Sequence, residues 1–333
     1  MIPCKNILLA VDTARLSVPV IERAARLAEL NQAQLLIADG LPQLNWAQKL
    51  SWNESEHIHE LLLREKTAKL KKLAASLRRR KLNVRYRVLV GRTSEELIRQ
   101  VLRSKCDLLI RETKGQHSVR TGLFGSTAME LLRACPCPVW LVNTAHEGPV
   151  QRIVAAVDTN PEKAQHPELD EAIVRAAMSL ATTYEAQLDL LHVWSIYGER
   201  MVRDYMKSNE FEELQGMMHR EHGDCLRQLA ERTGFAGGPE RTHLIRGDAT
   251  LEIPKFVAEN DTDLLVMGTL ARAGVSGFLM GNTSELVLNQ VNCSILALKP
   301  PGFVCPVKLR PKTSEPEATV DELPDVLPQP PVP

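Results

Sequence analysis

Short apolar runs alternate along this chain with longer segments in which apolar side chains recur every three or four residues. The first run, residues 7–12, is apolar on both faces until it ends at Asp12. A run without a polar face predicts a central parallel strand covered by helices, and the longer recurrence predicts amphipathic helices between the strands. The alternation therefore predicts an α/β fold of open parallel sheets with helices on both faces.

The first half of the chain holds one complete unit of this kind. Strands are predicted at 7–12, 35–38, 84–90, 107–110 and 139–142, and helices at 20–28, 56–80, 94–103 and 128–133. Gly91 closes the third strand. This order of strands and helices predicts a five-stranded, Rossmann-like sheet.

The second half repeats this unit. The run 153–158 repeats 7–12, and its final Asp158 lies 146 residues after Asp12. From the third strand onward the matches keep one offset of 156 residues, as between Gly91 and Gly247. The offset changes only where loops are expected, and loops accept insertions. We therefore predict two domains, at 1–147 and 148–303, followed by a proline-rich, acidic and disordered tail at 304–333.

Charge and cysteine content narrow the classes of partner. The 333 residues include 41 Lys and Arg against 41 Asp and Glu, so the basic footprint of a nucleic-acid binder is absent. No apolar run approaches the roughly 18 residues of a membrane span, and the start has no basic and apolar signal regions. Seven scattered cysteines are typical of free thiols in a reducing compartment. We expect a cytoplasmic protein.

Candidate chemistry lies at the carboxyl ends of the strands, where open α/β sheets bind ligands. Three segments of each unit meet there: the Asp that ends the first strand, the loop after the fourth strand, and the start of the last helix. The helix starts are Gly125-Ser126-Thr127 and Gly281-Asn282-Thr283. Exposed backbone N–H groups and the helix dipole at such a start favour a phosphate.

These segments resemble the universal stress protein family. Its nucleotide-binding members carry Gly-x2-Gly-x9-Gly-Ser/Thr after the fourth strand and an Asp at the end of the first. The segments Cys137-Pro138-Val139 and Leu190-Leu191-His192-Val193 are also similar to the family. The resemblance covers about residues 5–143 and 151–299, and the fused arrangement is similar to the E-type tandem members. It implies a non-enzymatic stress-response protein whose two domains pair through their fifth strands as an intramolecular pseudo-dimer.

Both units depart from the nucleotide motif. The first has Glu112 in place of the first Gly, and a carboxylate there would repel phosphate. The second has Ala271 and Asn282 in place of a Gly and a Ser. We therefore predict that ATP, if it binds, binds the second unit. Its candidate residues are Asp158, Gly268, Arg272, Gly281, Asn282 and Thr283, against a degenerate first set of Asp12, Gly115, Gly125, Ser126 and Thr127. The alternative is that both loops only cap helices, and that each Asp caps the turn that follows it.

No motif of a P-loop, dinucleotide or serine-hydrolase enzyme is present, and no metal site is expected. His219 and His222 are predicted to lie on a solvated helix face. We interpret the chain as an adaptor with an unidentified protein partner and a homo-oligomer as a further candidate state. A nucleotide sensor is the alternative, and a third interpretation is a carrier of a small apolar ligand. The cavity for that ligand would be lined by Trp46, Trp52, Met201, Tyr205, Met217 and Met218.

Overall fold

The computed structural model describes residues 4–42, 53–113, 124–144, 148–160, 167–269 and 280–310. These residues form two compact bodies. Of the described residues, the N-terminal body contains those in Cys4–Ile110 together with 307–310, and the C-terminal body contains those in Arg111–Pro306. Each body is described by itself.

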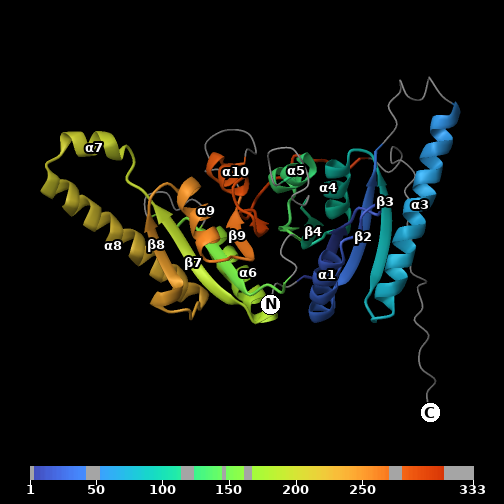
Figure 1. Cartoon of the computed structure of the whole chain (residues 1–333), viewed down its shortest axis with the longest axis horizontal. Coiled ribbons are helices and arrows are strands. Elements are labelled where there is room, and N and C mark those ends of the chain that lie inside the picture. Colours follow the sequence, from blue (N-terminus) through green and yellow to red (C-terminus); the bar gives the residue numbers. More distant parts are fainter. Residues whose placement is uncertain are drawn as a thin grey trace, which may run out of the picture. The chain divides into compact units, whose positions relative to one another are not determined.

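The N-terminal body is built on strands in the order β3-β2-β1-β4, in which β3, β2 and β1 pair in parallel. Its elements are β1 (Asn6–Ala10), α1 (Val18–Asn31), β2 (Gln34–Leu41), α3 (Asn53–Arg78), β3 (Val84–Val90), α4 (Thr93–Ser104) and β4 (Leu108–Glu112), the last of which runs into the second body. The long helix α3 lies along β3 (Figure 1). The chain runs from β1 outward to β3 and then crosses to β4 on the other side of β1, so the strand order reverses beside β1.

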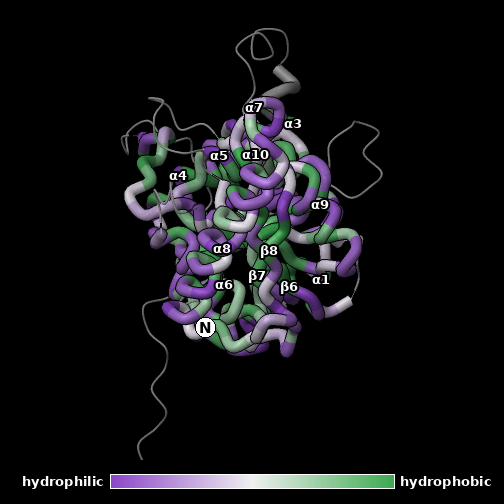
Figure 2. Tube along the Cα trace, turned by 90° about the vertical axis from the view of Figure 1, so that its left-hand side faces the viewer, coloured by the Kyte–Doolittle hydropathy of each residue, from purple (hydrophilic) through white to green (hydrophobic). Residues whose placement is uncertain are grey.

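The C-terminal body has strands in the order β5-β10-β9-β6-β7-β8. Its elements are α5 (Ser126–Ala134), β5 (Val139–Val142), β6 (Arg152–Val157), α6 (Pro167–Tyr184), β7 (Gln187–Trp194), α7 (Glu199–Tyr205), α8 (Ser208–Thr233), η1 (Pro239–Arg241), β8 (Thr242–Arg246), α9 (Ala249–Glu259), β9 (Leu264–Gly268), α10 (Asn282–Leu288) and β10 (Ser294–Leu298). The pairs from β10 to β8 are parallel. Hydrophobic stretches lie along the trace near β6, β7 and β8, and the surrounding helices carry both hydrophilic and hydrophobic stretches (Figure 2).

The two repeats pair through their last strands, as predicted. β5 is antiparallel to β10, with Leu141 opposite Ile295 and Val139 opposite Ala297. All four residues of β5 and all five of β10 are buried. This pairing covers two apolar edges that would otherwise be exposed, and it places β5 and α5 of the first repeat in the C-terminal body.

Matched residues of the two repeats make matched contacts. The carboxylate of Asp107 accepts hydrogen bonds from the backbone N–H groups of Lys5 and Asn6, at 2.6 and 2.8 Å. Asp263 accepts the equivalent bonds from Gln151 and Arg152, at 2.7 and 2.9 Å. Each Asp therefore fixes the start of the first strand of its repeat against the fourth.

The backbone conformation explains why a glycine follows the third strand in both repeats. Gly91 has φ of 139° and Gly247 has φ of 158°, values that favour glycine. A Cβ on either would also lie within 3.0 Å of the side chain of Glu96 or Glu252, in the helix that follows. The conserved spacing thus reflects a tight strand-to-helix turn rather than a ligand contact.

The prediction of a disordered tail from residue 304 was wrong for 307–310, which we call the C-terminal strap. The backbone oxygen of Lys308 accepts a hydrogen bond from Arg99 Nε at 3.3 Å. Arg310 pairs with Glu96 at 3.3 Å, and Glu96 is only 4% exposed. The buried carboxylate of Glu96 is thus paired with Arg310 in addition to Arg99. The composition of the tail alone does not reveal this contact. Residues 311–333 lie outside the described part of the chain.

Within the described residues, no helix is long and apolar enough to cross a membrane. All seven cysteines are free thiols, and burial raises the pKa of Cys4 and of Cys293 to about 12. Three predicted boundaries moved by three residues: β2 continues to Leu41, α1 continues to Asn31, and α3 begins at Asn53. The helix α7 was not predicted.

Candidate functional site

Asp12 of the first repeat follows β1 and is exposed. Its Oδ1 atom accepts a hydrogen bond from the backbone N–H of Ala14 at 2.9 Å. The carboxylate therefore caps the turn after the strand, which is the structural alternative that the sequence left open for this residue.

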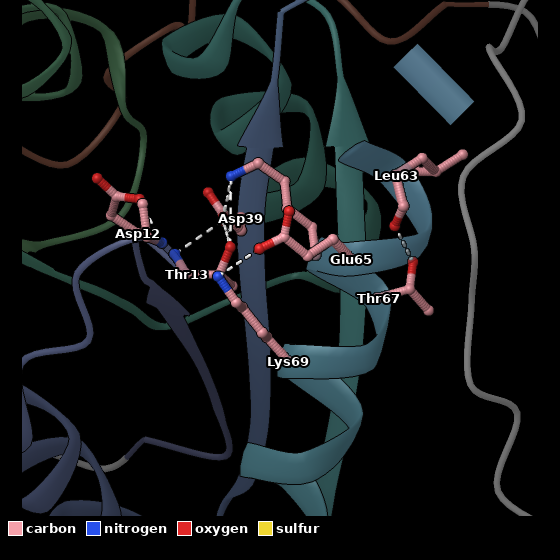
Figure 3. Close-up of polar contacts among 9 residues, drawn as sticks. Asp12, Thr13, Asp39, Leu63, Glu65, Thr67 and Lys69 are labelled. Atoms are coloured by element: carbon pink, nitrogen blue, oxygen red, sulfur yellow. Dashed lines mark hydrogen bonds and ion pairs between the residues drawn. The ribbon is translucent and has the colours of Figure 1, made fainter. Parts of the chain in front are cut away.

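The strand end beside Asp12 is occupied by a buried ion pair (Figure 3). Asp39, on β2, is 5% exposed, and its Oδ2 atom lies 2.5 Å from Nζ of Lys66 on α3. Thr13 adds two hydrogen bonds to the same oxygen, from its backbone N–H at 2.9 Å and its hydroxyl at 2.6 Å. Three donors thus satisfy one carboxylate oxygen and hold α3 over the carboxyl end of β2.

Sequence reasoning missed this network. The available signal was an Asp in the middle of the apolar segment Leu36-Ile37-Ala38-Asp39-Gly40-Leu41, because an isolated charge in a buried strand requires a partner. Lys66, however, lies 27 residues further along the chain. Only the packing of α3 on β2 identifies it as that partner.

The other candidate residues of the first repeat do not belong to the same body as Asp12 or lie outside the described residues. Gly125, Ser126 and Thr127 begin α5 in the C-terminal body, and Gly115 lies outside the described residues. Gly125 is the N-cap residue, with φ of −65°, and Ser126 is exposed. Glu112 accepts a hydrogen bond from the Thr144 hydroxyl at 2.9 Å.

In the second repeat Asp158 is exposed after β6, as Asp12 is after β1. Its backbone N–H donates to Oδ1 of Asp170, on α6, at 3.1 Å. Burial raises the pKa of Asp170 to about 6, and the nearby charge of Asp158 acts in the same direction. Two carboxylates therefore share this strand end, where a negatively charged ligand would be disfavoured.

Gly268 packs against a neighbouring helix. A Cβ on Gly268 would lie 2.9 Å from Cδ2 of Leu169, on α6. The absent side chain makes room for that leucine, so in this structure the position expected to face a ligand faces α6.

The start of α10 is more open. Gly281 is the N-cap residue with no side-chain capping bond, and Asn282 and Thr283 are exposed. Asn282 is the first residue of α10, and the N-cap position is taken by Gly281. The Asn282 side chain is therefore not at the position from which it could cap the helix. Arg272 and Ala271 lie outside the described residues.

A pair of histidines occupies the place of the ion pair in the second repeat. His192 lies opposite Val157 on β6 and Leu244 on β8, the positions equivalent to Val11 and Val88 beside Asp39. His222 lies on α8, 156 residues after Lys66. His192 Nε2 lies 2.8 Å from His222 Nδ1, and the two residues are 1% and 2% exposed. The prediction of a solvated face was correct for His219, which is exposed, and wrong for His222.

A threonine is shared by the two strand ends but is used differently. Thr159 follows Asp158 as Thr13 follows Asp12. The Thr159 hydroxyl is buried and has no hydrogen-bond partner among the described residues, whereas the Thr13 hydroxyl bonds to Asp39. The Asp that would accept this bond is replaced by His192.

Comparison with known proteins agrees with this duplicated geometry. The model of the universal stress protein family matches the chain twice, at residues 3–143 and 149–299. The chain belongs to the universal stress protein family. Universal stress protein E of Photorhabdus laumondii is 26% identical over 309 residues, which are 91% of this chain and 98% of that protein. Universal stress protein E of Salmonella typhi is 24% identical over 312 residues, 92% and 97% of the two chains.

Solved structures share the fold of this universal stress protein. A functionally unknown protein from Pseudomonas aeruginosa PAO1 superposes with a TM-score of 0.71 at 23% identity, over 90% of this chain and 94% of the other. A universal stress protein from Archaeoglobus fulgidus gives a TM-score of 0.58 at 15% identity, over 89% and 98%. The family membership and tandem arrangement expected from the sequence are therefore confirmed.

Proposed function

We propose that this universal stress protein acts as a non-enzymatic, two-repeat adaptor in the stress response. The observation that carries this proposal is that the chain fills its own strand ends. In the first repeat, Lys66 and Thr13 saturate the Asp39 oxygen. In the second repeat, Leu169 fills the space beside Gly268.

A weak nucleotide site in the second repeat is the second candidate function. One observation favours it over a site in the first: the buried Thr159 hydroxyl lacks a protein partner among the described residues, whereas the Thr13 hydroxyl bonds to Asp39. Asn282 and Thr283 are also exposed at the start of α10. Neutral histidines replace the negative Asp39 of the first repeat. The pair Asp158 and Asp170 opposes a triphosphate, so we expect binding to be weak.

The apolar-carrier alternative has little support from the described residues. Met201, Tyr205 and Met217 are 68%, 87% and 44% exposed, and Met218 packs against the cluster of Trp194, Ile196 and Phe211. Trp46 and Trp52 lie outside the described residues. Side chains that face solvent do not enclose a ligand.

Calorimetry and phosphate release with millimolar ATP test both proposals. The adaptor proposal expects no phosphate release, and turnover above the rate of a heat-inactivated sample would overturn it. The nucleotide candidate expects weak one-site heat that is lost in Gly281→Asp. The matched first-repeat variant Gly125→Asp should bind as wild type does, and Glu112→Gly should leave the heat unchanged or add a second site. Absence of heat and of a thermal shift in the wild type would leave the adaptor alone.

A further inference from the structure

We propose that the His192–His222 pair is an acid-sensitive latch that holds α8 on β7, and that the Asp39–Lys66 pair makes the equivalent contact of α3 insensitive to acid. Both pairs join the second strand of a repeat to its long helix, at matched positions. The two repeats of one molecule therefore differ in the chemistry of the same contact.

The protonation state of the latch follows from its hydrogen bonds. His192 Nδ1 lies 3.0 Å from the backbone oxygen of Val157, which can only accept, so this nitrogen carries a proton. In the neutral ring, Nε2 is then an acceptor, and it receives the hydrogen bond from His222 Nδ1. Two neutral rings thus satisfy each other. A doubly protonated pair would place two N–H groups against each other at 2.8 Å, and the contact would break.

The surroundings oppose charge on either ring. Burial lowers the pKa of His222 to about 4, with the neighbouring His192 acting in the same direction, and burial also lowers the pKa of His192. Asp158, at the end of β6, opposes both shifts, and the Val157 oxygen opposes that of His192. Among the described residues, no group of three histidines, cysteines or carboxylates could hold a metal ion.

The other titratable and charged groups near the latch are engaged elsewhere. On α6, Asp170 accepts a hydrogen bond from the Asp158 backbone. On β8, Arg246 pairs with Glu199 at 2.6 Å. On α8 itself, His219 is exposed and packs its ring against Trp194, with centroids 5.9 Å apart. The His222 ring also stacks on Trp194, with centroids 5.3 Å apart. Trp194 belongs to an apolar cluster with Ile196 and Phe211, so the latch also holds α8 against this cluster.

The direction of the pH effect is fixed by these shifts. Released histidines take up protons near pH 6.5, whereas in the docked pair burial lowers the pKa of His222 to about 4 and also lowers the pKa of His192. Release of α8 is therefore favoured as the pH falls below 6.5, and two titrating rings raise the released-to-docked ratio up to about a thousandfold between pH 7.5 and 5.0. The α3 contact is an ion pair between Lys66 and Asp39 and contains no histidine, so it lacks the group on which this pH effect depends.

Release of α8 would uncover Trp194 and Phe211 together with Ile196, which are 3%, 7% and 8% exposed when the helix is docked. The acid form of the protein would thus present an apolar surface in its second repeat only. The proposal is independent of nucleotide binding, because none of these groups needs a ligand.

Hydrogen exchange of the full-length protein, read by mass spectrometry at pH 7.5 and 5.0 with intrinsic rates corrected, tests the latch. Peptides of α8 should lose protection by about a hundredfold or more, up to the thousandfold limit set by two histidines. Peptides of α3 and of α9, which lies in the same body as α8, should change less than about threefold. Equal losses in α8 and α9, or no loss in α8, would overturn the proposal.

Variants separate the latch from general acid sensitivity. The double variant His192→Asp with His222→Lys copies the first-repeat pair, and the Thr159 hydroxyl stands ready as the equivalent of Thr13. It should abolish the pH response, while His219→Gln should retain it. His222→Gln, with one titrating ring left, should reduce the response to about thirtyfold. A full response in the double variant would overturn the proposal.

If the double variant does not fold, imidazole NMR of the wild type decides. The two buried rings should stay neutral down to the pH at which α8 loses protection. Titration of either ring near pH 6.5 while α8 remains protected would overturn the latch.

Discussion

At the residue scale, the strand ends of the two repeats differ in how their buried polar atoms are satisfied. One oxygen of Asp39 has three donors, whereas the equivalent His192 uses a backbone oxygen and a second histidine. The first arrangement carries charge and the second does not. Each side chain is stable only with its partner, so single substitutions should cost more than paired ones.

Asp39→Asn should therefore lower the free energy of unfolding by about 3 kcal/mol, because Lys66 is left with a charge and no counter-ion in a mostly buried position. Urea unfolding measures the loss. The matched control is Glu65→Gln, which breaks the exposed pair with Lys69 on the same helix and should leave the unfolding midpoint almost unchanged, because exposed ion pairs contribute little to stability. Equal losses in the two variants would show that the buried pair contributes nothing beyond a surface one.

Lys299 provides a second test at this scale. Its ammonium group donates to the Leu132 backbone oxygen and the Thr269 hydroxyl, and burial lowers the lysine pKa from 10.5 to about 8. Between pH 8 and 10.5 the unfolded chain holds a proton that the folded chain has lost, so stability rises with pH there by up to about 3 kcal/mol. Unfolding of wild type and Lys299→Met across this range should show the wild type gaining on the variant. If the free energies of unfolding of the two proteins changed in parallel with pH, the lowered pKa of Lys299 would be contradicted. Taking the difference between the two proteins also removes the contribution of the cysteines, which is the same in both.

At the element scale, contacts made by segments outside the regular sheet decide which body they join. The C-terminal strap belongs to the N-terminal body because Arg310 and the Lys308 oxygen meet Glu96 and Arg99 on α4. Arg80, at the end of α3, likewise reaches Glu22 and Glu29 of α1. These basic residues thus join α3 to α1 and the strap to α4.

Truncation tests the strap. Removal of residues 311–333 should leave the melting temperature unchanged within about one degree. Removal from 307 onward should lower it by roughly 2–4 °C, since a buried carboxylate loses a cation worth about 1–2 kcal/mol. Arg310→Ala should reproduce most of that loss. Identical melting curves for the two truncations would show that 307–310 adds no stability.

At the scale of the whole molecule, the β5–β10 pairing joins the repeats through reciprocal contacts. Arg133 on α5 pairs with Glu285 on α10 at 2.6 Å. Asn143 donates to the Asn292 oxygen at 2.6 Å, and Lys299 reaches the Leu132 oxygen from the other repeat. Each repeat therefore holds the end of the other repeat's last helix or the turn that follows it.

We expect the separately expressed halves, residues 1–147 and 148–303, to associate. Each half would expose an apolar strand that is fully buried in the whole protein. Sedimentation should show self-association of each half and a one-to-one complex on mixing. Arg133→Glu in one half should weaken the complex and Glu285→Arg in the other should restore it. Two well-behaved monomers without affinity for each other would refute this view of the interface.

The sequence by itself determined the duplication and the order of strands and helices, because apolar periodicity and repeated offsets are local or direct properties of the chain. The pairing of the last strands was expected only from the resemblance to the family. Val84–Val90 and Val139–Val142 were predicted to the residue, since their apolar runs end at turn residues. Candidate positions could be named at strand ends for the same reason. Their roles were decided by the tertiary structure: Gly268 faces Leu169, Asp12 caps its own turn, and Asp39 and His222 find partners 27 and 30 residues away. A buried polar group is satisfied by whatever the packing brings within hydrogen-bond distance, and no periodicity in the sequence records which helix that will be.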